Sequence, residues 1–559
     1  MANRLLLGDE AIALGALHAG LSGVYAYPGT PSTEITEYIQ GFVAKQQSPG
    51  IHTRWCTNEK TAMEAALGMS YAGKRALVCM KHVGMNVCAD AFVNSAITGV
   101  NGGLVVLAAD DPSMHSSQNE QDSRFYGKFA MIPVFEPSTQ QEAYDMMFEA
   151  YDLSERLRLP VLMRIVTRLA HSRANVVVRE QGAGSREQVG VREQNPLRPD
   201  EGRHWVLLPA IAKRQYASLI EKQKDMLSEA EVSRFNRLSS LELPFTPTST
   251  PLPNSSRRGI IACGIGYNYV MESGFTGPLL KVSQYPLPEK QIVELAQQCD
   301  EILVVEDGQP VVEELTKSIL QGAGSREQGA GVNVTGRLTG HLPRAGELTP
   351  DCVAAALNPA DEKQLSAATY QLSISQRPPQ LCQGCGHRDV YGALKEVVAE
   401  YEGARVFGDI GCYTLGALPP FQALNSTVDM GASITMAKGA ADAGVWPSIA
   451  VIGDSTFTHS GMTGLLDAVN DKSNMLVIIS DNLTTAMTGG QDSAGTNKFE
   501  QICLGLGVEP EHVRVVVPLP KNMEEIKQMM REEIEYQGVS VIIPRRECIQ
   551  TFRRHAKKG

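Results

Sequence analysis

Residues that offer oxygen atoms as metal ligands follow two apolar runs in the last third of the sequence. The first run ends at Gly453 and is followed by Asp454, and the second is followed by Asn482 and Thr484. Carboxylate, amide and carbonyl oxygens suit Mg²⁺, which takes octahedral geometry and usually shares its coordination with phosphate groups. A phosphate can approach the backbone closely at Gly453, because glycine has no Cβ. The pattern predicts a site for magnesium and a diphosphate, with Asp454, Asn482 and Thr484 as candidate ligands.

The elements that would position these residues are indicated by the same stretch. The apolar runs 449–452 and 475–480 are expected to be buried parallel strands, with a helix over 461–469 between them. Such a strand–helix–strand unit brings the ends of its strands to one edge of the sheet, where ligands bind in open α/β sheets. The alternative is an ordinary α/β turn with incidental Asp and Asn residues, which explains polar residues after one strand better than after both.

Four cysteines form a second candidate group. Cys382 and Cys385 are spaced as C-x-x-C. Cys412 follows a glycine at an expected strand end, and Cys548 follows the last expected strand. Eleven cysteines in a chain of this size do not indicate a disulfide scaffold, so the C-x-x-C pair indicates metal or redox chemistry in a reducing compartment. A zinc half-site and buried thiols in a packed core are the alternatives.

Length and composition indicate an ordinary globular protein. The chain has 559 residues, of which 43% are hydrophobic and 20% are charged, and this length suggests about three or four domains. The net charge of −11 gives no reason to expect nucleic acid or an anionic membrane as a partner. No apolar run approaches the roughly 20 residues that span a bilayer. Asp9 and Glu10 interrupt the N-terminal apolar stretch, so we expect a cytoplasmic protein without a signal peptide.

The N-terminal part of the chain is expected to form an α/β domain. Strands over 23–27 and 75–80 alternate with helices over 8–20 and 59–71, which predicts a parallel doubly wound sheet. Glu59 begins the second of these helices, where the helix dipole favours a carboxylate. A solvated carboxylate and a catalytic carboxylate are both compatible with this position.

Low-complexity stretches suggest where the chain is divided. Gly-Ala-Gly-Ser-Arg-Glu-Gln occurs at 182–188 and again at 322–328, and we expect both copies to be surface insertions because such sequences cannot bury a core. The Pro-rich stretch 244–253 is expected to be an extended linker. The expected segments are a first domain over 1–172, an insertion and linker over 173–255, a small α/β domain over 256–350, and a last α/β domain over 375–550.

Several stretches carry a resemblance to a known family. The stretch 453–482 resembles the thiamine diphosphate signature, with Ser455 in place of its last glycine. The segment 27–32 matches the Y-P-x-T-P-S loop of the 2-oxoacid:ferredoxin oxidoreductases, and 110–122 and 408–415 are also specific. Over nearly its whole length the chain resembles the indolepyruvate ferredoxin oxidoreductase α subunits.

This resemblance implies a multidomain α/β protein with parallel doubly wound sheets of the thiamine diphosphate-binding fold. Residues 1–172 would form the pyrimidine-binding domain, and 375–550 the diphosphate-binding domain. Residues 256–350 would form a transketolase C-terminal-like domain that orients the other two. Thiamine diphosphate and Mg²⁺ are implied to bind between the first and the last domain.

The resemblance also implies roles for individual residues. Glu59 falls at the activating glutamate of the family, whose hydrogen bond to the aminopyrimidine ring prepares the cofactor for carbanion chemistry. Lys81, His82 and Arg124 are candidates for binding the substrate carboxylate, with a surface or supporting role as the alternative. The residues implied to surround the cofactor further include Thr30, Gly411, Cys412, Gly431, Gly453, Asp454, Ser455, Asn482 and Thr484.

The cysteines match a third feature of the wider family. In the wider family, cysteines in the same four sequence contexts as Cys382, Cys385, Cys412 and Cys548 hold the [4Fe–4S] cluster nearest to the thiamine. The resemblance therefore implies one such cluster here. Related subunits usually continue into a C-terminal ferredoxin-like domain with two cysteine-rich motifs. This chain ends at Gly559 without those motifs, so we expect electrons to leave by another route or through a separate protein.

The implied activity is the ferredoxin-dependent oxidative decarboxylation of arylpyruvates to aryl-acetyl-CoA and CO₂, with indolepyruvate as the leading substrate. A smaller β subunit, ferredoxin and coenzyme A would be the partners, in a hetero-oligomer. A non-redox thiamine-dependent decarboxylase or carboligase is the first alternative, which aldehyde release without an electron acceptor would reveal. A scaffold subunit that only binds the cofactor is the second, and the presence of Glu59, Asp454 and Asn482 argues against it.

Overall fold

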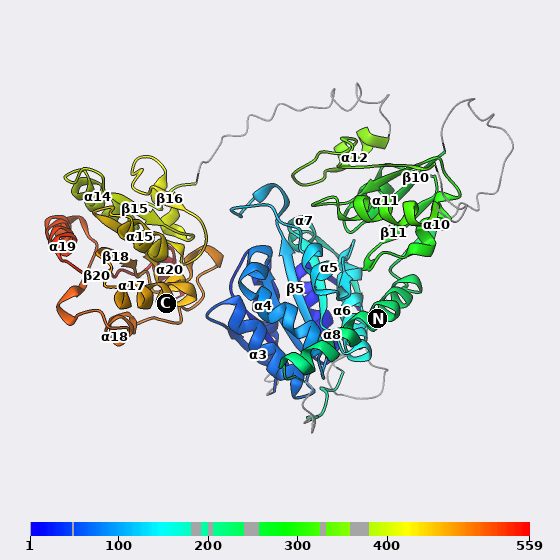
Figure 1. Ribbon diagram of the computed structural model, residues 1–559, viewed down its shortest axis with the longest axis horizontal. Helices are drawn as coiled ribbons and strands as arrows, with labels where there is room; N and C mark the ends of the chain where they lie inside the picture. Colours follow the sequence, from blue (N-terminus) through cyan, green and yellow to red (C-terminus); the bar gives the residue numbers. More distant parts are fainter. Residues whose placement is uncertain are drawn as a thin grey trace. The chain divides into compact units, whose positions relative to one another are not determined.

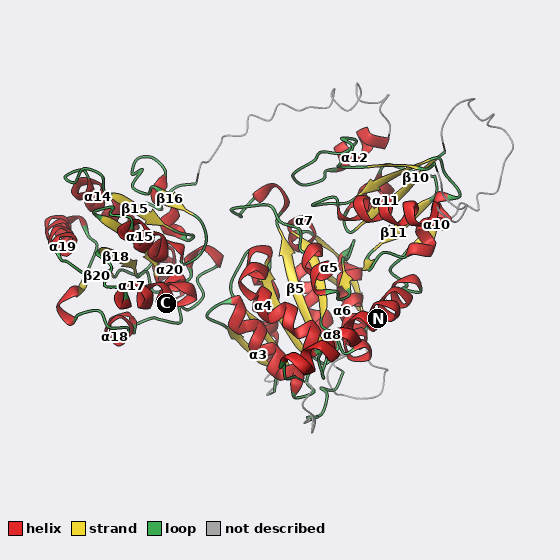
Figure 2. Ribbon diagram, in the orientation of Figure 1, coloured by secondary structure: helices red, strands yellow, loops and turns green. Residues whose placement is uncertain are grey.

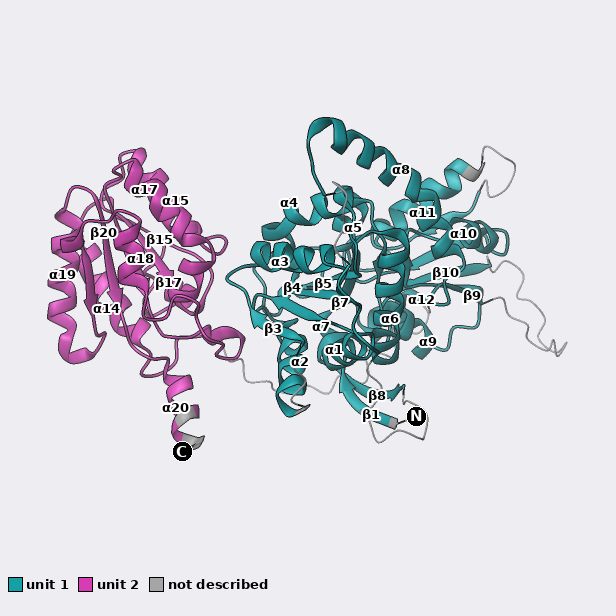
Figure 3. Ribbon diagram, turned by 90° about the horizontal axis from the view of Figure 1, so that it is seen from below, with its two compact units in different colours: residues 1–371 teal, residues 372–559 magenta. Residues whose placement is uncertain are grey.

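The computed structural model describes two compact units, which comprise residues 1–371 and 372–559 (Figure 3). The described residues are 2–46, 50–179, 192–198, 205–239, 257–324, 331–357 and 379–558. Both units contain β-sheets covered by helices (Figures 1 and 2). The expected linker 244–253 and the first seven-residue repeat lie outside the described residues. The second repeat begins at the end of helix α11 (Val311–Gly324), and the remainder of it also lies outside them.

A seven-stranded sheet forms the centre of the first unit. All of its neighbouring strands are parallel except β12 and β6. In order across the sheet, its strands are β12 (Gln284–Tyr285), β6 (Val134–Phe135), β7 (Val161–Val166), β5 (Leu104–Asp110), β4 (Ala76–Lys81), β2 (Gly23–Ala26) and β3 (His52–Trp55). The helices that accompany it include α1 (Gly8–His18), α2 (Thr33–Gln46), α3 (Glu59–Tyr71), α4 (His82–Thr98), α5 (Arg124–Ala130), α6 (Gln140–Leu157) and α7 (Thr167–His171).

Helices cover both faces of this sheet. Figure 3 shows α3 and α4 on one face and α1 and α2 on the other, and α1 packs against both α2 and α6. Strands β4, β5 and β7 are apolar along most of their length and buried, as expected for a parallel sheet covered on both sides. The predicted doubly wound architecture is therefore confirmed for this part of the chain.

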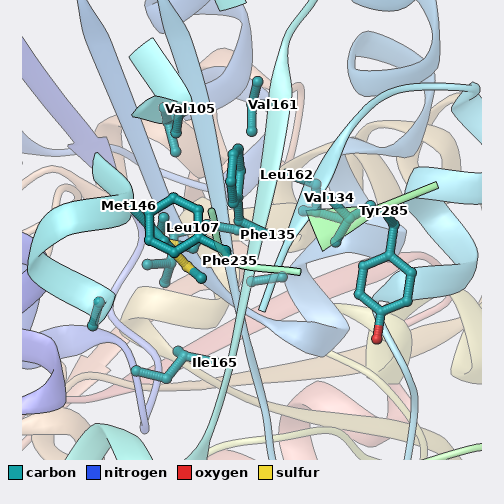
Figure 4. Packing of buried hydrophobic residues seen from close by; sticks show 14 of the residues in the cluster. Val105, Leu107, Val134, Phe135, Met146, Val161, Leu162, Ile165, Phe235 and Tyr285 are labelled. Atoms are coloured by element: carbon teal, nitrogen blue, oxygen red, sulfur yellow. The ribbon is translucent and has the colours of Figure 1, made fainter. Parts of the chain in front are cut away.

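The core of the first unit includes residues from distant parts of the sequence. Figure 4 shows side chains of β5, β6 and β7 packed with Phe235 and Tyr285. The rings of Phe135 and Phe235 meet edge to face, with their centroids 5.9 Å apart, an arrangement that aromatic pairs favour. The segments that contain Phe235 and Tyr285 are thus anchored to the first sheet.

A second, five-stranded sheet belongs to the same compact unit. Its pairs are parallel except for that between β11 and β9. Its strands, in order, are β14 (Asn333–Thr335), β13 (Glu301–Val305), β10 (Arg258–Cys263), β11 (Leu279–Val282) and β9 (Arg237–Ser239). The helices of this region are α9 (Gly266–Glu272), α10 (Glu289–Ala296), α11 and α12 (Pro350–Leu357).

Three elements of the segment 173–255, expected to be an insertion and linker, are part of the folded unit. Strand β8 (Arg173–Val178) pairs antiparallel with β1 (Ala2–Leu7), and β9 extends the five-stranded sheet. Helix α8 (Pro209–Glu231) packs against α4 and α6 and buries Leu219 and Met226. Alternate side chains near the end of β8 are buried, and α8 has an apolar stripe that packs on the unit. These stretches therefore belong to the fold and are not linkers.

Buried charges join the seven-stranded and five-stranded sheets of the first unit. Nε–H of Arg164 in β7 donates to Asp110 Oδ2 at 2.6 Å, and its guanidinium also pairs with Glu136. Nη2–H of Arg164 donates to the carbonyl of Asp307 at 2.8 Å, in the loop after β13. A buried ion pair is maintained only when its remaining polar atoms are also bonded. The guanidinium of Arg164 meets that condition through two carboxylates of the seven-stranded sheet and the Asp307 carbonyl after β13.

Replacing Arg164 with methionine should therefore destabilise the first unit by about 3–5 kcal/mol, because the buried carboxylate of Asp110 would lose its cationic partner and Glu136 would keep only the pairing with Arg124. Calorimetric unfolding can measure the loss, since only the transition of this unit should shift. Arg173→Met is a matched control, because Arg173 is exposed in the same unit. Equal shifts in both variants would contradict this role of Arg164.

The second unit is built on one fully parallel six-stranded sheet. Alternate residues of its central strand enter two cores, with Ile449 and Val451 in one and Ala450 and Ile452 in the other. The strands, in order, are β16 (Ser426–Thr427), β15 (Arg405–Gly408), β17 (Ser448–Gly453), β18 (Met475–Ser480), β20 (Val539–Pro544) and β19 (Val513–Val516). The helices include α14 (Gly386–Val398), α15 (Ala432–Asp442), α17 (Met462–Asn470), α18 (Phe499–Gly505), α19 (Met523–Glu535) and α20 (Ile549–Lys558).

None of the helices described in either unit combines the length and apolar character that a membrane crossing requires.

Candidate active site

The three predicted magnesium ligands meet at the carboxyl ends of two adjacent strands. Strands β17 and β18 pair in parallel, with Gly453 opposite Ser480, so the residues that follow them share one edge of the sheet. The backbone N–H of Thr484 donates to Asp454 Oδ2 and to Asn482 Oδ1, at 3.1 Å in both cases. The structure therefore brings Asp454, Asn482 and Thr484 together, as the sequence predicted.

Asp454 is a buried carboxyl group that lacks a cationic partner among the described residues. It is 3% exposed, and the backbone N–H of Ser455 donates to its Oδ1 at 2.6 Å. Burial raises the pKa of Asp454 to about 7, and the neighbouring Asp481 contributes to the rise. Asp481 itself accepts from Arg545 at 2.6 Å. A divalent cation at Asp454 would compensate the charge that burial disfavours.

The helical segment after β17 begins earlier than the predicted start at 461. A helical stretch begins at once with α16 (Asp454–Thr456), passes through a π-helical turn over Phe457–Gly461, and continues into α17. Such π-turns often occur at functional sites. Ser455 therefore lies in the first helical turn, with its hydroxyl 2.8 Å from that of Thr485. Backbone N–H groups at a helix start favour anions.

Asp409, which was not among the predicted site residues, organises the two glycine loops beside this helix. It accepts from the Ser433 hydroxyl at 2.7 Å, from the backbone N–H of Gly431 at 3.2 Å, and from the Tyr413 phenol. Burial raises the pKa of Asp409 to about 8. Its position directly after an expected strand, two residues before Gly411, is the feature of the sequence that could have identified it.

The ring of Tyr413 explains two of the glycines. A Cβ added at Gly453 would lie 2.5 Å from the ring, and one at Gly411 would also overlap it. Gly431 has a φ of +95°, in the left-handed region that favours glycine. These glycines are therefore required by the local fold: Gly411 and Gly453 make room for the Tyr413 ring, and Gly431 adopts a φ that other residues rarely adopt.

All four predicted cluster cysteines line one cavity of about 130 Å³. The C-x-x-C pair forms a turn in which the N–H of Cys385 donates to the carbonyl of Cys382 at 3.1 Å. Cys412 follows Gly411, and the N–H of Cys548 donates to the carbonyl of Asn482 at 3.0 Å. The cavity is thus adjacent to a predicted magnesium ligand, and Asn482 lines it too.

The thiols in this cavity influence one another. Burial raises the pKa of Cys412 to about 12, and the neighbouring Cys385, Cys548 and Cys382 contribute to the rise. All eleven cysteines of the chain are free thiols. Within the described ranges, no three of these sulfurs lie within 4.8 Å of one another. Binding of a metal here would require these thiols to lose their protons.

Glu59 is not the solvated carboxylate that its position at a helix start allowed. It is 6% exposed, while Asn58 caps α3 by accepting the N–H of Thr61 at 2.8 Å. A Cβ at Gly84 in α4 would lie 2.7 Å from Glu59 Cγ and 2.8 Å from its Oε1. Gly84 thus provides the space that the carboxyl group of Glu59 occupies.

Lys81 and His82 join β4 to α4 and contact the loop after β5. Nζ of Lys81 donates to the carbonyl of Ser116 at 2.5 Å, and His82 Nε2 lies 3.1 Å from Asn119 Oδ1. Burial lowers the pKa of Lys81 to about 8. Thr30 lies in a loop in which the N–H of Gly29 donates to the Thr33 hydroxyl at 3.0 Å, and a Cβ at Gly29 would lie 3.2 Å from that of Lys81.

The structure corrects the assignment of Arg124. This residue is 2% exposed, and its Nε–H and Nη2–H groups donate to Asp122 at 3.0 and 2.6 Å. Nη2–H also donates to the carbonyl of Gln309 at 2.9 Å, while Nη1 lies 3.0 Å from Glu306. Because its donors are used within the fold, Arg124 joins the two sheets and is not a binder of a substrate carboxylate.

Two protein-family models match the chain. "Pyruvate flavodoxin/ferredoxin oxidoreductase, thiamine diP-bdg" matches residues 14–232. "Thiamine pyrophosphate enzyme, C-terminal TPP binding domain" matches residues 409–543. The first match includes Glu59, Lys81 and His82, and the second includes the residues at the ends of β17 and β18.

Curated relatives are similar over almost the whole chain. The indolepyruvate oxidoreductase subunit IorA of Methanothermobacter thermautotrophicus is 37% identical over 570 residues, which cover 97% of this chain and 86% of the relative. IorA of Pyrococcus abyssi is 36% identical over 586 residues, covering 97% and 85%. The solved 2-oxoglutarate:ferredoxin oxidoreductase of Magnetococcus marinus, with 2-oxoglutarate, coenzyme A and succinyl-CoA bound, overlaps 64% of this chain and 65% of its own, with 16% identity and a TM-score of 0.46. From the near full-length similarity to the curated relatives, the chain belongs to the family of the indolepyruvate oxidoreductase subunits IorA, within the thiamine diphosphate-dependent 2-oxoacid oxidoreductases.

Proposed function

We propose that this chain is the catalytic subunit of a ferredoxin-dependent enzyme that oxidatively decarboxylates arylpyruvates to aryl-acetyl-CoA and CO₂, with indolepyruvate as the leading substrate. One observation carries the redox part of the proposal. Four cysteines line one cavity, and the backbone N–H of one of them, Cys548, donates to the carbonyl of Asn482 in the predicted magnesium site. The aryl side chain of the substrate is suggested by the names of the relatives.

The residues of the second unit suit thiamine diphosphate and magnesium. The Asp454 carboxylate, the Asn482 amide oxygen and the Thr484 carbonyl would hold Mg²⁺, which shares its coordination with phosphates. Backbone N–H groups hold the buried carboxylate of Asp454 in place, and the nearby Asp481 adds a second negative charge. A cation bound there would offset this charge, which supports the proposal. When bound, thiamine diphosphate supplies the carbanion chemistry of the reaction. The residues proposed to line its site in this unit are Gly411, Cys412, Gly431, Gly453 and Ser455.

The first unit would act on the other end of the cofactor and on the substrate. The buried carboxyl group of Glu59 would hydrogen-bond the aminopyrimidine ring, and Thr30 would contact the cofactor from its loop. Lys81, with a pKa of about 8, is mostly protonated at neutral pH and can attract the substrate carboxylate. His82 lies next to it at the start of α4 and is the second candidate for this role.

The proposed partners are a smaller β subunit, ferredoxin and coenzyme A, in a hetero-oligomer. One [4Fe–4S] cluster held by Cys382, Cys385, Cys412 and Cys548 would pass electrons toward ferredoxin. Its four thiolates would be the usual ligand set of such a cluster. The cluster, the magnesium ion and the subunit composition are each open to direct measurement.

The proposal can be tested with the complex of this chain and the proposed smaller β subunit, purified without oxygen. Indolepyruvate and phenylpyruvate should reduce ferredoxin only when coenzyme A is present, and faster than pyruvate or 2-oxoglutarate does. Ferredoxin reduction that is equally fast with pyruvate would reject the arylpyruvate preference. Aldehyde formation without any electron acceptor would instead favour a non-redox decarboxylase.

Glu59→Gln should slow turnover by about 10²–10⁴-fold, the range for loss of a positioned proton-transfer group, while most cofactor affinity remains. The direct readout is exchange of the C2 hydrogen of bound thiamine diphosphate, followed by NMR. Glu64→Gln is the matched control, because the side chain of Glu64 is 48% exposed on the same helix. If exchange in Glu59→Gln proceeds at the wild-type rate, Glu59 supports only the packing of α3 against α4.

A further inference from the structure

A second group of ligand-type side chains lies in the first unit. Asp9 in α1, Glu34 in α2 and His171 at the end of α7 each offer one ligand atom, and these atoms lie within 4.8 Å of one another. In the part of the chain that the structure describes, this is the one group of three or more His, Cys, Asp or Glu residues with that spacing. None of the three is among the residues assigned above to the cofactor, magnesium or the cysteine cavity.

Asp9 is the most unusual member of this group. It is 0% exposed, and neither carboxylate oxygen has a hydrogen-bond partner among the described residues. Burial raises the pKa of Asp9 well above its usual range, and the nearby Glu34 and Glu10 raise it further. A buried carboxylate without donors is strongly disfavoured, so the site needs either a proton or a cation next to Asp9.

The other two residues complete a set that suits a cation. Glu34 Oε2 is also buried without a hydrogen-bond partner in the described residues, while Oε1 lies 3.6 Å from His171 Nε2. Two carboxylates would neutralise a divalent ion inside the protein. His171 is exposed, so an ion can reach the group from solvent on that side.

We propose that Asp9, Glu34 and His171 bind one divalent transition-metal ion of the Zn²⁺ class. An imidazole nitrogen with two carboxylates suits Zn²⁺ and its first-row neighbours, whereas Mg²⁺ and Ca²⁺ prefer oxygen ligands alone. Three protein ligands leave one position for water in a tetrahedral site. The ion would tie together the first turns of α1 and α2 and the end of α7. Because α2 begins at Thr33, it would also steady the loop that contains Thr30.

The test compares Zn²⁺ binding by the metal-stripped full chain and three variants, using equilibrium dialysis and metal analysis. Wild type should bind one Zn²⁺ per chain more than Asp9→Asn or His171→Gln, and Glu37→Gln should match wild type. Glu37 is an exposed residue of the same helix as Glu34. The cysteines are present in all four proteins, so the difference counts only this site. Equal Zn²⁺ content in all four would overturn the proposal.

Thermal unfolding provides a second measurement, which separates loss of Zn²⁺ binding from a change in the stability of a variant. Without metal, Asp9→Asn should melt no lower than wild type, because an amide replaces a buried carboxylate of the same shape. Added Zn²⁺ should raise the melting temperature of wild type with concentration, and should leave Asp9→Asn and His171→Gln unchanged. An equal Zn²⁺-dependent rise in the three proteins would show that Asp9 is buried as a neutral acid and that the ion binds elsewhere.

Discussion

Replacing Asp454 with alanine should abolish the Mg²⁺-dependent binding of thiamine diphosphate and, with it, oxidative decarboxylation. Asp454 is the one charged group among the three proposed magnesium ligands, and a hard divalent ion depends on such oxygen ligands. The carboxylate is held in place by the backbone N–H groups of Ser455 and Thr484. Neither the Asn482 amide nor the Thr484 carbonyl can supply the missing charge.

Titration calorimetry with the cofactor, in the presence and absence of Mg²⁺, measures this loss directly. Asp467→Ala is the matched control, because Asp467 is exposed on α17, the helix that continues from Asp454. Circular dichroism should show that both variants keep the α/β fold. Unchanged cofactor affinity in Asp454→Ala would remove the magnesium assignment, whatever the activity of the variant.

The residues at the ends of β17 and β18 could be predicted because their signal is local. A continuous apolar run indicates a parallel strand, and the polar residue that follows it must then lie at the ligand-binding edge. The register that places Gly453 opposite Ser480 follows from this arrangement. The helical turn at Asp454 was harder to predict from the sequence, because Gly461 resembled a helix start and π-helical turns have no distinct sequence period.

Long-range pairing explains the elements that the sequence did not predict. Strand β1 pairs with β8, and neither strand has another neighbour in its sheet. The burial of Arg124 depends on Asp122 beside it and on Glu306 from the second sheet. A charged residue in such a network has the same local sequence as one in an active site, so only the structure separates the two.

Replacing Cys412 or Cys548 with serine should bleach the anaerobically purified protein and stop ferredoxin reduction, while thiamine diphosphate binding stays largely intact. Both residues line the cavity that also contains Cys382 and Cys385, and a [4Fe–4S] cluster takes four thiolates. Wild type should be brown and carry about four irons per chain. Serine is a poor substitute for a thiolate ligand, so each variant should lose most of this iron.

The control for this prediction is Cys352→Ser, because Cys352 is half-buried in the first unit and lies outside the cavity. Iron and zinc analysis separates a cluster from a zinc site, since one zinc per chain with no iron would indicate the latter. Buried thiols with a raised pKa, as at Cys412, become ligands only when metal binding compensates for the loss of their protons. A colourless, iron-free wild-type preparation that still passes electrons from arylpyruvate to ferredoxin would assign the redox centre to a partner subunit.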